Sequence, residues 1–188
     1  TPLEHLQLDV LTTLRSPFEL EGGISYQVFD ERKGDMLSLT PRLSFNTRGN
    51  MVGGELTASR FIVEDLWQVG ADVRVLSNAS EDSFNRPGAA MGFNTMVRVW
   101  KDSHVFGDLV VPFDGDILSQ RSLLWSAGVK KKIPHTPHVL TFYAGNTQEQ
   151  SLSGRTLAPE GTQSDLFRLG FIFSIDIPSL TELPGRLF

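Results

Sequence analysis

Apolar and polar residues alternate along most of this chain. The segment SLTPRLSFN at residues 38–46 is typical: Leu39, Leu43 and Phe45 fall on one face with Pro41, and the polar residues between them fall on the other. A period of two indicates β-strands, and no segment shows a sustained helical period. The alternation predicts about ten strands, near residues 4–15, 18–29, 36–47, 51–63, 66–77, 89–101, 105–114, 122–132, 138–147 and 166–177.

The predicted strands are long. Most have about 10 to 13 residues, whereas strands of globular proteins usually have about 5 to 6. A tilted strand needs about 9 to 11 residues to cross a bilayer. Strand length therefore favours a sheet that spans a membrane.

The connections between strands follow the order of the chain. Links that follow even-numbered strands are short, whereas the three long segments, 77–88, 114–121 and 147–165, all follow odd-numbered strands. An up-and-down sheet places these three at one end, as in outer-membrane barrels with short turns on one side and long loops on the other. We predict an all-β, antiparallel, up-and-down β-barrel of about ten strands, transmembrane, with residues 1–188 as a single domain.

The alternation alone does not say which face lies inside. Charged residues recur on the less apolar face of nearly every predicted strand, and Arg42 and Glu55 are expected to form a cross-strand pair. If the apolar face meets lipid, the charged candidates for the lumen are Arg42, Glu55, Asp72, Arg74, Arg98, Asp108 and Arg168. If the faces are inverted, the chain is a soluble barrel whose apolar residues line a pocket for a lipid or pigment. A third reading is a fragment that completes its sheet with other chains.

Two prolines oppose a simple barrel. Pro41 and Pro112 lie inside predicted strands, and proline cannot donate a hydrogen bond to a neighbouring strand. We expect bulges or strand ends at these positions.

Composition excludes several classes of function. The chain has 17 basic and 22 acidic residues and a net charge of −5, which gives no electrostatic basis for nucleic-acid binding. Its only basic run, Lys130–Lys132, is interpreted as a solvated strand end. There are no cysteines, so disulfides and thiolate chemistry are excluded.

No apolar segment has the length of a spanning helix, about 18 to 20 residues. The chain begins at Thr1, from which we expect that a signal peptide was removed or the chain trimmed.

The histidines do not indicate an enzyme. Catalysis at the long-loop rim of a barrel would need a histidine there as general base, but His104, His135 and His138 are predicted at the opposite end, and His5 lies near the N-terminus. The HTPH turn at residues 135–138 lacks the further ligands that zinc requires. We predict no catalytic residues, metal or cofactor.

The C-terminal hairpin carries a resemblance. It consists of PHVLTFYAGNTQ (137–148), SLSGRTLAPEGT (151–162) and LFRLGFIFSI (166–175). These segments resemble a family of small bacterial outer-membrane β-barrel proteins of uncharacterised function. The resemblance implies a barrel in the cell envelope and supplies no catalytic residues.

These observations lead to one expected function and one alternative. We expect a non-enzymatic barrel of the bacterial outer membrane that acts as an anchor or a partner-binding component, with a narrow pore as a further option. Its partners would be outer-membrane lipid and other envelope or extracellular proteins, bound through loops 77–88, 114–121 and 147–165. The alternative is the soluble barrel with an apolar ligand.

Overall fold

The computed structural model describes residues 6–13, 19–47, 50–77, 87–113, 123–136, 138–147, 152 and 167–175. These residues form ten strands and one short 3-10 turn. The strands are β1 (Leu6–Thr13), β2 (Glu19–Tyr26), β3 (Ser38–Asn46), β4 (Met51–Val63), β5 (Trp67–Leu76), β6 (Gly88–Trp100), β7 (Ser103–Phe113), β8 (Leu124–Lys132), β9 (His138–Gly145) and β10 (Arg168–Ile175), and the turn η2 covers Glu31–Lys33. Each predicted strand corresponds to one of these ten.

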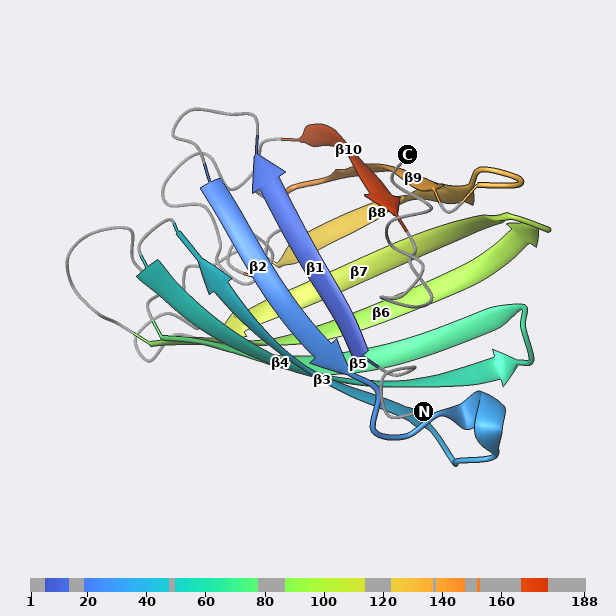
Figure 1. Ribbon diagram of the computed structural model, residues 1–188, viewed down its shortest axis with the longest axis horizontal. Helices are drawn as coiled ribbons and strands as arrows, with labels where there is room; N and C mark the ends of the chain where they lie inside the picture. The colour runs from blue at the N-terminus through green and yellow to red at the C-terminus, as the bar shows by residue number, and fades with distance from the viewer. Residues whose placement is uncertain are drawn as a thin grey trace.

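All ten strands belong to one antiparallel sheet, in which their order is that of the sequence. The sheet curls into a half-barrel (Figure 1). Among the described residues, β1 pairs only with β2 and β10 only with β9, so no ladder joins the two edges within this part of the chain. The predicted all-β, antiparallel, up-and-down architecture is confirmed.

The two ends of the sheet differ. The odd-numbered strands β1 to β9 all run toward one end, where the links 77–88, 114–121 and 147–165 leave the sheet. We call this the long-loop end. The opposite end, the short-turn end, holds the turns after β2, β4, β6 and β8. The predicted placement of the three long links at one end is therefore confirmed.

Both prolines lie where a ladder stops. The ladder between β2 and β3 ends at Ser25 and Arg42, and one isolated bridge, between Phe29 and Leu39, follows with a shifted register. Pro41 lies in this gap, so its missing N–H does not interrupt a continuous ladder. Pro112 is the penultimate residue of β7, beyond the last pair with β8. The expected irregularity and strand end are both present.

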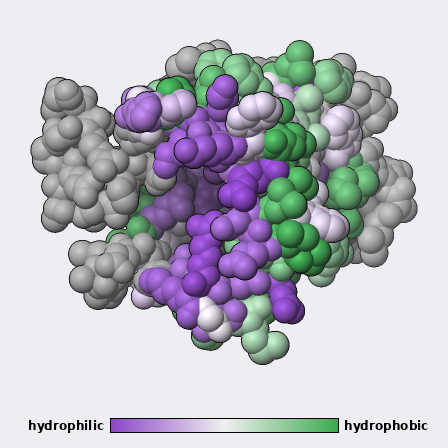
Figure 2. Space-filling model, turned by 90° about the vertical axis from the view of Figure 1, so that its right-hand side faces the viewer, coloured by the Kyte–Doolittle hydropathy of each residue, from purple (hydrophilic) through white to green (hydrophobic). Residues whose placement is uncertain are grey.

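The faces of the sheet are separated by polarity. Leu43, Phe45, Val73 and Phe171 lie on the outer, convex face, where they are 62%, 49%, 50% and 67% exposed. The residues that alternate with them face the concave side, and Figure 2 shows hydrophilic residues gathered around a hollow at the short-turn end. Apolar residues therefore cover the outside of this sheet, and polar residues fill much of its inside.

A small apolar cluster lies inside the sheet at the long-loop end. Buried on the concave face, it consists of Ala90, Val110 and Leu124, and Met51, Leu76 and Leu152 are also buried at this end. Together with the polar residues deeper inside, it gives the interior an apolar layer next to a charged one. Among the residues described, no helix is long and apolar enough to cross a membrane.

Candidate functional site: an ionic network on the concave face

The centre of the concave face holds a row of alternating charge. Arg42 on β3 pairs in register with Glu55 on β4, and Glu55 pairs with Arg74 on β5. Residues directly opposite each other on antiparallel strands have Cβ atoms about 4.5–5.5 Å apart, so the three charges meet by register alone. The Arg42 guanidinium lies 3.6 Å from the Glu55 carboxylate, and that of Arg74 lies 3.2 Å from it. The predicted cross-strand pair of Arg42 and Glu55 is confirmed.

Arg42 connects this row to the first two strands. Its Nη2 lies 2.5 Å from the Asp9 carboxylate on β1 and donates a hydrogen bond of 3.0 Å to Glu21 on β2. Asn46 donates a further hydrogen bond of 3.2 Å to Glu21. Four neighbouring strands, β1 to β4, are therefore linked through one guanidinium.

Arg74 performs the same role on the other side of the row. Its side chain is only 1% exposed and lies against Glu55, Asp72 and Asp108. The guanidinium is 2.5 Å from Asp72 and 3.7 Å from Asp108 on β7. A buried cation with several carboxylate partners retains its charge, because the partners offset its desolvation. The network thus extends from β1 to β7.

Glu21 also holds a residue from the link between β9 and β10. The backbone N–H of Leu152 donates to both carboxylate oxygens of Glu21, at 3.1 Å and 2.9 Å. The Leu152 side chain is fully buried and lies over Gly53 beside Leu76. This contact joins positions 131 residues apart in sequence and covers the network on its long-loop side.

Two glycines make room for this arrangement. A Cβ at Gly92 would overlap the carboxylate of Asp72, and a Cβ at Gly53 would lie 2.5 Å from a methyl group of Leu152. Real Cβ atoms do not make contacts this short. The register shifts at Phe61/Val63, at Arg98/Trp100 and between β2 and β3 lie elsewhere. Space for neighbouring side chains therefore explains these glycines better than bulges do.

The predicted lumenal residues separate into two groups. The network contains Arg42, Glu55, Asp72, Arg74 and Asp108. Arg98 also faces the concave side, but near the short-turn end, where it pairs in register with His104. Arg168 begins β10 at the long-loop end, opposite Gly145.

Glu21, Asp9 and Leu152 belong to the network but were not among the predicted site residues. Alternation places Asp9 and Glu21 on the charged face, so the pattern contained a signal for them. No signal marks Leu152, since a single leucine in a polar link has no period. Its position follows from a contact across the fold.

The described histidines lie where the sequence predicted them. His104 is the second residue of β7, His135 lies in the turn after β8 and His138 begins β9, all at the short-turn end. His5 lies outside the described residues. Over the same part of the chain, no group of three or more His, Cys, Asp or Glu residues is arranged to hold a metal ion.

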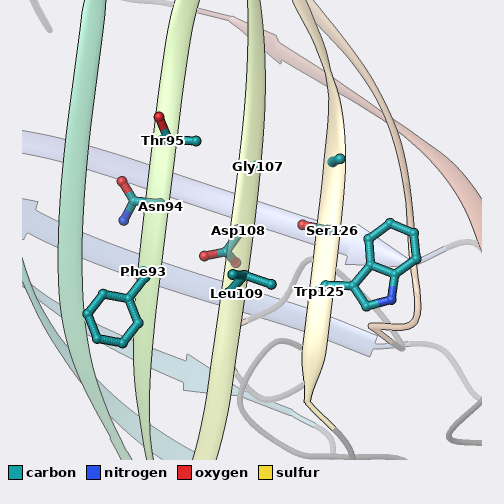
Figure 3. A pocket seen from close by; sticks show the side chains of 9 residues that line it. Phe93, Asn94, Thr95, Gly107, Asp108, Leu109, Trp125 and Ser126 are labelled. Atoms are coloured by element: carbon teal, nitrogen blue, oxygen red, sulfur yellow. The ribbon is translucent and has the colours of Figure 1, made fainter.

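An apolar depression lies on the outer face of β6, β7 and β8. Figure 3 shows Phe93, Leu109 and Trp125 in one row across the three strands, and beside this row lies Gly107, which has no side chain to fill the space. A Cβ at Gly107 would meet nothing closer than Thr95, at 3.7 Å. The depression therefore opens to the outside of the sheet, away from the ionic network.

No protein-family model, curated protein or solved structure matches the chain. The resemblance of the C-terminal hairpin to small outer-membrane barrels consequently stays a prediction.

Proposed function

We propose that this protein is a membrane-embedded β-barrel-type protein of the bacterial outer membrane. It acts as an anchor or a partner-binding component, with an interior closed by charged side chains. The observation that carries the proposal is the opposite polarity of the two faces of the same strands. Leu43, Val73 and Phe171 on the outer face are 62%, 50% and 67% exposed, whereas Glu21 and Arg74 on the inner face are each 1% exposed.

Energetics support lipid as the neighbour of the outer face. Transfer of apolar surface out of water is favourable by about 25 cal/mol per Å², and an apolar surface this extensive is unusual for a soluble monomer. Phe45, Phe113 and Trp125 lie toward the long-loop end of the outer face, and Trp67 lies toward the other end. Aromatic residues at both margins are typical of barrels in membranes.

The interior of the described sheet favours a role as an anchor and not as a wide channel. Arg42 and Arg74 bridge carboxylates from several strands, and Leu152 is buried above them. A barrel of about ten strands has little room beyond its own side chains. A narrow pore is the second candidate, and the hollow at the short-turn end is the feature that favours it.

The soluble alternative requires apolar residues around an enclosed pocket. Leu43, Phe45 and Val73 are instead exposed on the outer face, and the apolar depression around Gly107 opens outward. These placements favour the membrane proposal.

Folding in detergent tests the proposal. The protein should remain monodisperse only with detergent or lipid. Its unheated form should migrate differently from its heated form in a denaturing gel, because folded barrels resist the detergent. Single-channel recording in a planar bilayer separates the two candidates: an anchor gives no stable conductance, and a narrow pore gives small discrete steps. Stable monodisperse protein without detergent would overturn the proposal.

A further inference from the structure

A second charged row crosses the concave face near the short-turn end. Arg98 on β6 pairs in register with His104 on β7, and His104 pairs with Lys130 on β8. Inward-facing residues alternate with the exposed Phe93, Val105 and Val129 on these strands. The three nitrogen-bearing side chains therefore stand side by side on the inner wall.

This row lacks the carboxylates that accompany the central network. Within the described segments, no carboxylate lies within ion-pair distance of Arg98 or Lys130. His104 lies within electrostatic range of both cations and of Asp102. Arg98 and Lys130 lie two strands apart with His104 between them, so these two like charges repel each other only weakly. The row is therefore better suited to bind a negatively charged ligand than to stabilise the sheet.

The types and spacing of the side chains suit a phosphate-bearing group. Neighbouring strands are about 4.8 Å apart, so the Cα atoms of Arg98 and Lys130 are separated by about 10 Å and their long side chains can converge over His104. Arginine offers a planar pair of N–H donors to phosphate, and lysine offers a compact charge. The hollow at this end of the concave face is lined with hydrophilic residues (Figure 2).

We infer that Arg98, His104 and Lys130 form a binding site for a phosphate-bearing group at the short-turn mouth of the half-barrel. The basic run at residues 130–132 is divided by strand alternation. Lys130 faces the concave side with His104, and Lys131, opposite Ser103, faces outward. Lys132 shares the concave face with Lys130 but pairs with Val139 at the end of β8, so Lys130 is the lysine in register with His104.

Lys131 therefore provides a matched control on the same strand. Protein folded in an uncharged detergent is titrated with inorganic phosphate and pyrophosphate, and binding is measured by calorimetry. Wild-type protein should bind at least one of the two saturably. Lys130→Gln and Arg98→Gln should each weaken binding about tenfold, since a charged hydrogen bond is lost. Lys131→Gln should bind within about twofold of wild type.

A second arm identifies the source of the phosphate. The titration is repeated with phosphatidylglycerol added to the detergent micelles, and displacement of pyrophosphate is measured. Displacement that depends on Lys130 assigns the site to a lipid headgroup, and its absence assigns it to a soluble phosphate compound.

Two results would overturn the inference: no saturable binding of phosphate, pyrophosphate or the lipid, or equal losses in Lys130→Gln and Lys131→Gln. Detergent dependence tests the proposed function separately, because folded protein can be titrated whether or not it needs a membrane. A gel-mobility control confirms that each variant is folded.

Discussion

Two rows of side chains cross the concave face in the same way but differ in charge. Arg42, Glu55 and Arg74 pair in register across β3, β4 and β5, with signs that alternate. Arg98, His104 and Lys130 pair in register across β6, β7 and β8, with no negative member. The first row is neutralised within the fold. The second leaves positive charge facing the hollow.

The difference shows that an inward charge has two distinct uses in one sheet. Buried cations with several carboxylates hold strands together, and their loss should reduce stability. A partly exposed cation without a carboxylate adds little stability and is available to a ligand.

Replacing each arginine by methionine compares the rows directly. Arg74→Met should lower the free energy of unfolding by about 3–5 kcal/mol, because it leaves buried carboxylates without their cation. Arg98→Met should change it by about 0.5 kcal/mol or less. Denaturant unfolding of the detergent-folded protein measures both. Similar losses of unfolding free energy in the two variants would show that the two rows do not differ in their contribution to stability.

Neutralising Glu21 tests the attachment of Leu152. Glu21→Gln should cost about 1.5–3 kcal/mol, since charged hydrogen bonds to Arg42 and the Leu152 N–H are weakened. Hydrogen exchange at the Leu152 amide should accelerate in parallel. Glu64→Gln, in the turn after β4, serves as the control and should leave that amide unchanged. An equally protected Leu152 amide in Glu21→Gln would contradict the contact.

Two glycine substitutions test how tightly the inside is packed. Gly92→Ala should destabilise the protein by about 1–2 kcal/mol, because its Cβ meets the Asp72 carboxylate. Gly107→Ala points into the outer depression and should be neutral or stabilising by about 0.5 kcal/mol. Thermal unfolding of the two variants compares their stabilities. An unchanged unfolding temperature in Gly92→Ala would show that the side chains of the network are not tightly packed there.

Removing a charge from the second row should slightly stabilise the sheet. Lys130→Gln relieves the repulsion with Arg98, two strands away, and should raise the free energy of unfolding by about 0.2–0.5 kcal/mol at low salt. Added salt should reduce this gain, because it screens exposed charges. Denaturant melts at two salt concentrations, with Lys131→Gln as reference, measure the effect. A clear loss of stability would mean that Lys130 has a structural partner.

Most of the fold follows from alternation. A period of two identifies the strands, and link lengths give their up-and-down order, so the pairing of Arg42 with Glu55 was predictable from one hairpin. The direction of the faces was not, because alternation is symmetric and fits either orientation. Leu152 was also beyond prediction, since its position depends on Glu21, which is distant in sequence. The phosphate site required the register of three strands, which joins residues that share no motif.

A pair of spin labels tests whether the outer face of the sheet meets lipid. The chain has no cysteines, so single cysteines can be introduced at Leu56 on the outer face and at its neighbour Thr57 on the inner face, then labelled with a nitroxide. In reconstituted bilayers, the account predicts greater collision with oxygen, which concentrates in lipid, at residue 56 and lower collision at residue 57. The reverse order, or equal access of a water-soluble nickel complex to both labels, would contradict it.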